Sequence, residues 1–166
     1  MPQIVPMTEK EIKFSLRVFE TAAELSAEDK ALMQQAQEAL DNAYAPYSKF
    51  RVGAAVLLQN GKVVTGTNQE NASYPVGICA EGTALGAASS LFPNVAIRKI
   101  AITVKSETHV VDHPVAPCGI CRQRLLEYEN RYNQPIEIII MGEEGKVYSI
   151  ATVKDILPLY FSKSDL

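Results

Sequence analysis

No part of the sequence is apolar over a length that could cross a bilayer, which takes about 20 residues. The uncharged apolar runs, such as 52–58, are far shorter. The order of a secretory signal, basic residues and then an apolar segment, is also missing from the first residues, MPQIVPMTEKEIK. We therefore expect a cytoplasmic protein with no membrane partner.

Clusters of positive charge are missing as well. The 16 Lys and Arg residues are outnumbered by 19 Asp and Glu residues, the net charge is −3, and no basic block occurs. Proteins that bind nucleic-acid phosphates usually have a cationic face, so we expect no nucleic-acid partner. Cysteine is scarce too, and the odd number of three disfavours a closed disulfide framework. Such thiols are more often metal ligands or catalytic groups.

The apolar pattern of the 166 residues indicates one domain in which helices and strands alternate. Alternation predicts a strand near 11–19, and helical spacing behind the N-cap Ser26 predicts a helix over 27–43. Asn60-Gly61, between two apolar runs, predicts a β-hairpin. Further helices are predicted at 79–91, 117–128 and 152–157, and further strands at 100–104, 136–141 and 146–150. We expect an α/β fold whose mixed sheet has helices on its faces.

Two cysteines one helical turn apart mark the start of the predicted helix at 117–128. In Cys118-Gly119-Ile120-Cys121, positions i and i+3 share a helix face, so both sulfurs can reach one point. The positive end of the helix dipole also favours thiolate over thiol. Taken alone, this motif fits a redox dithiol, half of a structural zinc site, or an incidental pair of buried cysteines.

The third cysteine favours a zinc site. Cys79-Ala80-Glu81 begins another predicted helix, and three thiolates with no fourth ligand in any motif predict one open position, as catalytic zinc requires. The two histidines, His109 and His113, lie in a polar loop, where we expect ordinary surface residues. A carboxylate two residues after a ligand, as in Glu81, is placed to move protons for a metal-activated water.

The order of these residues carries a family resemblance. C-A-E followed by P-C-x-x-C is similar to the zinc deaminase signature, with cysteine in place of its first histidine. The chain resembles cytidine deaminases of the small, homotetrameric, three-cysteine type. The resemblance implies a three-layer α/β/α sandwich for a zinc-dependent deaminase domain at 27–166, preceded by an N-terminal extension at 1–26 that contains the strand near 11–19. The segments that carry it are 45–55, 67–72, 117–123 and 157–161.

The resemblance also implies a reaction, a cofactor and an assembly. The reaction is the hydrolytic deamination of cytidine and 2′-deoxycytidine to uridine and 2′-deoxyuridine, with release of ammonia, in pyrimidine salvage. One Zn²⁺ per subunit would be held by Cys79, Cys118 and Cys121, and Glu81 would carry protons to ring N3 and to the departing amino group. The assembly would be a homotetramer with active sites at subunit interfaces, acting on a small-molecule nucleoside.

Contacts to the nucleoside follow from the same resemblance. The implied contacts are Phe50 against the base, Ala80 at the cytosine edge, Asn68 and Glu70 at the ribose 3′-hydroxyl, and Ala72, Tyr74 and Phe161 from neighbouring subunits. From the residues alone, Asn68 and Glu70 would be a polar turn after a strand. Phe50 and Phe161 would be packing residues.

Two positions depart from the family pattern. Ala116 stands where the family usually has Ser, and Gly82 stands where Arg commonly follows the catalytic Glu. The resemblance implies that such an Arg hydrogen-bonds the ligand thiolates and draws off part of their charge. Here we expect compensation from the two helix N-termini first, and from Arg122, beside Cys121, second.

Other functions remain open from the sequence. A deaminase of nucleoside antibiotics, of the blasticidin type, would keep the same zinc motifs, although Phe50, Asn68 and Glu70 favour ordinary cytidine. Deaminases of RNA or DNA usually have His as the first ligand and a cationic surface. From other classes, a thiol oxidoreductase or a zinc-stabilised binding module would also use the cysteines. A structural zinc site, however, would have four protein ligands.

Overall fold

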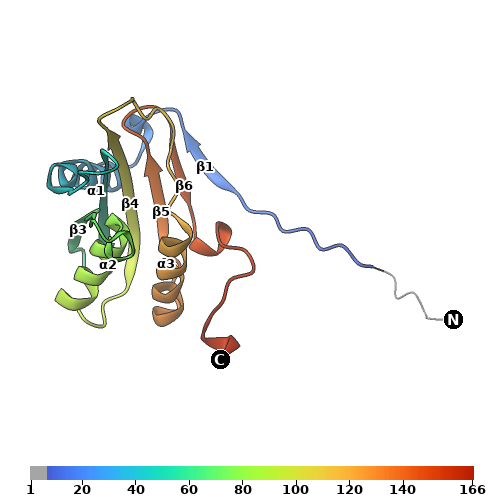
Figure 1. The fold of residues 1–166 in the computed structure, drawn as a ribbon. Coiled ribbons are helices and arrows are strands. Elements are labelled where there is room, and N and C mark those ends of the chain that lie inside the picture. The colour runs from blue at the N-terminus through green and yellow to red at the C-terminus, as the bar shows by residue number, and fades with distance from the viewer. Residues whose placement is uncertain (1–6) are drawn as a thin grey trace.

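A six-stranded mixed sheet forms the centre of the molecule (Figure 1). The computed structural model describes residues 7–166, in which the strand order is β1-β6-β5-β4-β2-β3. Neighbouring strands are antiparallel except β4 and β5, which run parallel. The strands are β1 (Leu16–Phe19), β2 (Phe50–Leu58), β3 (Val63–Thr67), β4 (Ile97–Ser106), β5 (Glu137–Met141) and β6 (Val147–Ile150). The mixed sheet predicted from the sequence is confirmed.

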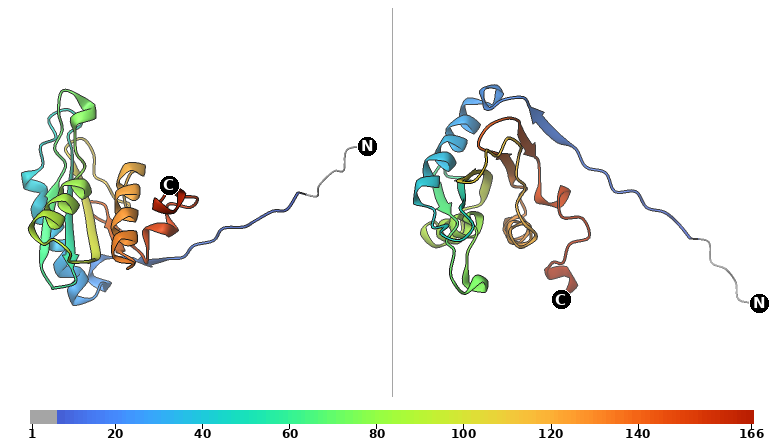
Figure 2. Two further views of the ribbon diagram at one scale, coloured as in Figure 1. Left: turned by 90° about the horizontal axis from the view of Figure 1, so that it is seen from below. Right: turned by 45° about the horizontal axis from the view of Figure 1, so that its top comes forward.

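Three α-helices cover the two faces of this sheet. They are α1 (Ala27–Ala39), α2 (Ala80–Leu91) and α3 (Gly119–Tyr132). Successive residues of β2 point to opposite faces, so Val56 packs in a core cluster with α2 and α3, whereas Leu57 packs in a second cluster with α1. Figure 2 shows the helices beside the sheet from two further directions. These three layers are the predicted α/β/α sandwich.

The local signals read from the sequence act as expected at the start of α1 and in the hairpin. The hydroxyl of Ser26 accepts a hydrogen bond from the Asp29 amide at 3.1 Å, as an N-cap should. The predicted helix over 27–43 is α-helical to Ala39, and a 3₁₀ turn continues it to Asn42. In the hairpin between β2 and β3, Gly61 has a φ of +79°, a conformation that glycine adopts without strain.

The N-terminal strand is shorter than the alternating pattern near 11–19 predicts. β1 pairs with β6 from Leu16, opposite Ile150, to Phe19, opposite Val147. Because β6 itself has only four residues, it can pair with no more of the preceding segment. Residues 7–15 run away from the body of the molecule (Figure 1).

In the part of the chain from residue 7 onward, no helix is both long and apolar enough to span a membrane.

Candidate active site

One edge of the sheet gathers the residues that the sequence assigns to chemistry. β2 is antiparallel to both β3 and β4, so the ends of β3 and β4 lie beside the start of β2. Phe50 is paired with Ser106, and Gly53 with Thr67. Because α2 follows β3 and α3 follows β4, the N-termini of both helices return to this edge.

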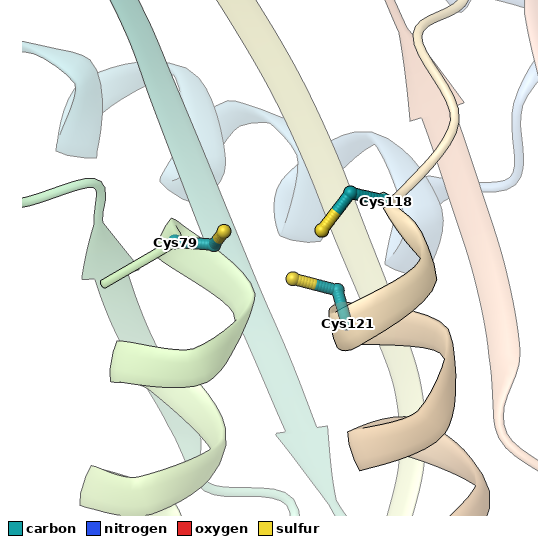
Figure 3. Close-up of side chains that lie close together, drawn as sticks. All are labelled: Cys79, Cys118 and Cys121. Atoms are coloured by element: carbon teal, nitrogen blue, oxygen red, sulfur yellow. The ribbon is translucent and has the colours of Figure 1, made fainter. Parts of the chain in front are cut away.

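The three cysteines meet at these helix ends. Cys79 is the N-cap of α2, Cys118 is the N-cap of α3, and Cys121 lies one turn farther along α3. Their side chains point toward one another (Figure 3), and their sulfurs all lie within 4.8 Å of one another. Tetrahedral zinc bound to thiolates at about 2.3 Å would hold the sulfurs about 3.8 Å apart, so small side-chain movements make the cluster fit this ion.

Both histidines lie away from the cluster, as expected. The ring of His109 contacts the hydroxyls of Ser106 and Thr108, at 3.3 and 3.0 Å, and His113 contacts Asp112 at 3.3 Å. Among residues 7–166, the metal-binding group therefore consists of three thiols. Such a set leaves one position of a tetrahedral ion free, which fits catalytic zinc better than structural zinc.

The pKa values of the thiols favour the binding of a cation. A hydrogen bond from the Cys121 thiol lowers the pKa of Cys79 to about 6, against the opposing effect of burial. The same hydrogen bond, together with burial, raises the pKa of Cys121. The cluster thus takes up one negative charge readily and resists further ones. Three thiolates therefore require a positive ion between them.

Glu81 is the buried carboxylate of the site. It lies in the first turn of α2 with only 5% of its surface exposed. Burial raises the pKa of its carboxyl group, and its own backbone amide, the Cys121 thiol and the charge of Arg124 oppose this shift in part. A carboxyl group whose pKa is moved toward neutrality can both take up and release a proton at working pH.

A cavity of about 800 Å³ opens beside the cysteines and is large enough for a small organic molecule. It brings together many of the residues that the sequence predicts for the site. These are Phe50, Asn68, Glu70, Tyr74, Cys79, Glu81 and Cys118.

The polar pair of the cavity also holds its wall in place. The Asn68 side chain accepts a hydrogen bond from the Val52 amide at 2.8 Å and donates one to the Phe50 carbonyl at 2.9 Å. One oxygen of Glu70 accepts hydrogen bonds from the amides of Tyr47 and Ser48, at 2.9 and 3.2 Å. These bonds and the charge of a nearby lysine lower the pKa of Glu70, although burial acts in the opposite direction. Glu70 therefore remains a carboxylate.

Three predicted contact residues do not line this cavity in the single chain. Ala80, the first residue of α2, is fully buried, so only its backbone could serve a ligand. Ala72 and Phe161 are exposed elsewhere on the surface. The Phe161 carbonyl accepts a hydrogen bond from the Gln123 side chain at 2.9 Å, which ties the C-terminal segment to α3.

Sequence reasoning missed several apolar residues of the cavity wall. Ile102 and Val104, on one face of β4, and Ile120, between the two cysteines of α3, all line it. The sequence contains a signal for Ile120, because it stands between two predicted ligands at the start of a helix. In the single chain its side chain is 65% exposed. Tyr47 also lines the cavity, in the turn before β2.

The expected role of Arg122 is wrong. Its Nε donates to the Pro117 carbonyl and its Nη1 to the Ile156 carbonyl, each at 2.8 Å, so it braces the segment before α3. Neighbouring helix residues point in different directions, and both hydrogen bonds of Arg122 go to backbone carbonyls rather than to a thiol. Arg124, three residues after Cys121, is on the same side as the cluster, and this spacing is the signal that was overlooked.

A buried carboxylate beside three thiols that leave a metal position open is the arrangement of a zinc-dependent hydrolytic enzyme. The sequence profile of the cytidine and deoxycytidylate deaminase zinc-binding region matches residues 26–133. The chain belongs to this family.

Individual relatives agree with this assignment. Cytidine deaminases of Halalkalibacterium halodurans and Sporosarcina psychrophila are each 38% identical to the chain, over 81% of its length and over 95% and 92% of theirs. The crystal structure of cytidine deaminase from Burkholderia pseudomallei is 38% identical, covers 79% of this chain and 97% of its own, and gives a TM-score of 0.69. That of Mycobacterium tuberculosis, 32% identical, covers 82% and 99% with a TM-score of 0.63.

Proposed function

We propose that this protein catalyses the hydrolytic deamination of cytidine and 2′-deoxycytidine to uridine and 2′-deoxyuridine, with release of ammonia, in pyrimidine salvage. The observation that carries the proposal is one cavity lined both by a buried carboxylate with ligand thiols, Glu81 with Cys79 and Cys118, and by the polar pair Asn68 and Glu70. The first group suits hydrolysis at a ring carbon, and the second suits a sugar hydroxyl.

The ligands of the zinc ion in this proposal are Cys79, Cys118 and Cys121. When bound, one Zn²⁺ per subunit supplies a water molecule of lowered pKa for attack on C4 of the cytosine ring. The donor set agrees with this ion because thiolates are soft ligands and the three sulfurs lie within 4.8 Å of one another. Such a thiol set also suits the reducing cytoplasm, in which we place the protein.

Glu81 moves the protons. A carboxyl oxygen takes up the proton that the attacking water releases and passes it to ring N3. The same carboxyl group then takes up the second proton of that water, from the hydroxyl now on C4, and delivers it to the amino group, which leaves as ammonia. The raised pKa of this buried group supports the role, because it brings the pKa closer to the pH at which the group must exchange protons.

The other residues orient the nucleoside. The ring of Phe50 packs against the base, and the backbone of Ala80 binds its edge. The amide of Asn68 and the carboxylate of Glu70 bracket the ribose 3′-hydroxyl as donor and acceptor. The Tyr47 and Ser48 amides bind one oxygen of Glu70, so the 3′-hydroxyl would bind the other.

A homotetramer with active sites at its interfaces is part of the proposal. Tyr74 and Phe161 are 74% and 59% exposed in the single chain, and Ile120 at the cavity is 65% exposed. Apolar side chains around a site in this number favour coverage by another subunit. Ala72, Tyr74 and Phe161 would then complete a neighbour's site. Sedimentation of the purified protein measures the assembly directly.

The decisive experiment combines zinc analysis with a direct assay. We expect one zinc ion per chain, a fall in cytidine absorbance on incubation, and uridine and ammonia in equal amounts; 2′-deoxycytidine is assayed in parallel. Turnover of a blasticidin-type nucleoside in place of cytidine would redirect the substrate assignment. Tightly bound zinc with no turnover of either would favour a binding module, and thiol–disulfide exchange without deamination would favour an oxidoreductase.

A further inference from the structure

A side chain from α3 fills the space beside Gly82 on α2. A Cβ atom placed on Gly82 would overlap Nη1 of Arg124 and would lie 3.2 Å from its Cζ and 3.8 Å from its Cδ. The guanidinium therefore lies against the first turn of α2, next to the residue that follows Glu81. A larger residue at position 82 would have to push the arginine aside.

The charge of the surrounding groups explains why a cation belongs here. Three thiolates and the Glu81 carboxylate carry four formal negative charges, of which Zn²⁺ neutralises two. The remaining charge is costly in a partly buried site unless a further cation lies close. The guanidinium of Arg124 lies beside Gly82, the residue after Glu81, and is therefore placed close to this charge.

Arg124 is available for this role, whereas Arg122 is not. Arg122 is held by the carbonyls of Pro117 and Ile156. Among residues 7–166, Arg124 forms no ion pair with a carboxylate within 4.0 Å. Its position three residues after Cys121 places both on one side of α3, toward α2.

We propose that Arg124 is a positioning residue of the metal centre, whose guanidinium lies over Gly82 and compensates the negative charge of the zinc-bound thiolates. Gly82 is the other half of this arrangement, because the absence of its side chain makes the room. The arginine thus reaches the site from the second ligand helix instead of from the residue after Glu81. The inference rests on the zinc site of the proposed function. It explains how the negative charge of the site is compensated although Gly82 stands where Arg is common in the family.

The first test replaces the arginine in the full-length protein. Zinc affinity is measured by competition with a chelating dye, alongside the kcat and KM for cytidine. We expect Arg124→Gln to weaken zinc binding at least about tenfold and to lower kcat with little change in KM, and Arg124→Lys to retain more of both. The matched control is Arg131→Gln on the same helix, whose guanidinium stacks on Tyr132, 5.3 Å from the ring centre. It should leave zinc affinity unchanged.

The second test moves the charge from one helix to the other. Arg124→Ala should weaken zinc binding, and adding Gly82→Arg should restore it to within about threefold, since the space is then empty. The uncharged double variant Gly82→Met with Arg124→Ala fills the same space without charge and should not restore affinity. Wild-type zinc affinity in Arg124→Gln, or rescue by the methionine variant, would overturn the proposal. If the double variants fail to fold, the Gln and Lys variants decide alone.

Failure of the proposed function is distinguishable from failure of this inference. Absence of deamination by the wild-type protein would reject the function. The zinc-affinity series needs no turnover and would still test whether Arg124 supports the metal centre.

Discussion

Two buried glutamates of this molecule differ in what surrounds them. Glu81 and Glu129 are 5% and 3% exposed. Glu129, on α3, accepts hydrogen bonds from the Ile136 and Val153 amides, each at 2.9 Å, and from the Thr152 hydroxyl at 2.8 and 3.0 Å. Glu81 instead faces the cavity, where the Cys121 thiol and its own backbone amide are its partners.

The difference shows that burial alone does not mark a functional carboxylate. The bonds of Glu129 connect α3 to the residue before β5 and to the turn after β6, so its oxygens are committed to the fold. The oxygens of Glu81 are not committed in this way, and burial raises its pKa. The identity of the donors separates the structural carboxylate from the one that can exchange a proton.

The largest effect is expected when the site loses a metal ligand. Cys118→Ala should lose nearly all bound zinc and all turnover, and stability should fall by about 3–5 kcal/mol because the binding energy of the ion is lost and the negative charge that remains on the other two cysteines lacks its counter-charge. Zinc analysis and urea unfolding measure both. Ile120→Ala, between the two cysteines, is the matched control and should keep its zinc. Full zinc occupancy in Cys118→Ala would remove Cys118 from the ligand set.

Glu81→Gln should lower kcat by about 10²- to 10⁴-fold, because an amide cannot take up and deliver protons. Zinc content should be unchanged. Since burial raises the pKa of Glu81, ionising it opposes folding above the pKa of an unfolded glutamate. The neutral amide avoids this effect, so unfolding of the metal-free variant at pH 7 should require no less urea than the wild type. Near-normal turnover with bound zinc would refute the proton role.

The same substitution at the other glutamate should have the opposite result. Glu129→Gln should leave kcat per folded molecule close to wild type and lower stability by about 1–3 kcal/mol, because charge-assisted hydrogen bonds to buried amides are weakened. Urea unfolding and a steady-state assay measure the two quantities. A stable Glu129→Gln protein with greatly reduced turnover would break the comparison between the two residues.

Much of the fold and of the metal cluster could be predicted because the signals are local. Ser26 caps its helix through a residue three positions away, Asn60-Gly61 forms its own turn, and Cys118 and Cys121 share a helix face. The cluster needed one further step, the meeting of two helix N-termini at one sheet edge, and the alternation of strands and helices made that step reasonable.

What could not be predicted depends on contacts between distant segments. Arg124 reaches Gly82 across two helices, and the partners of Glu129 lie up to 24 residues away. The length of β1 is set by the four residues of β6 rather than by its own pattern. The proposed contacts of Ala72 and Phe161 would need a second chain, which no pattern within one chain can place.

The smallest effect is expected at the N-terminal segment, which contains neither of the two glutamates. β1 is tied to the sheet by its pairing with β6 and by Arg17, which donates to the Ser149 hydroxyl at 2.9 Å and forms an ion pair with Glu137. Residues 7–15 lack such ties, and Phe14 is 52% exposed.

Two truncations of the proposed extension, residues 1–26, therefore separate its parts. Deleting residues 1–15 should change stability by less than about 0.5 kcal/mol, because residues 7–15 are exposed and exposed residues without packing contribute little. Deleting residues 1–20 should lower stability by about 1–3 kcal/mol and reduce solubility, because the edge of β6 is then unpaired. Neither truncation should alter kcat if the only role of the extension is to complete the sheet. Loss of assembly and of turnover in the shorter truncation would instead assign residues 7–15 to a neighbouring subunit, and an unchanged 1–20 deletion would show that β1 is dispensable.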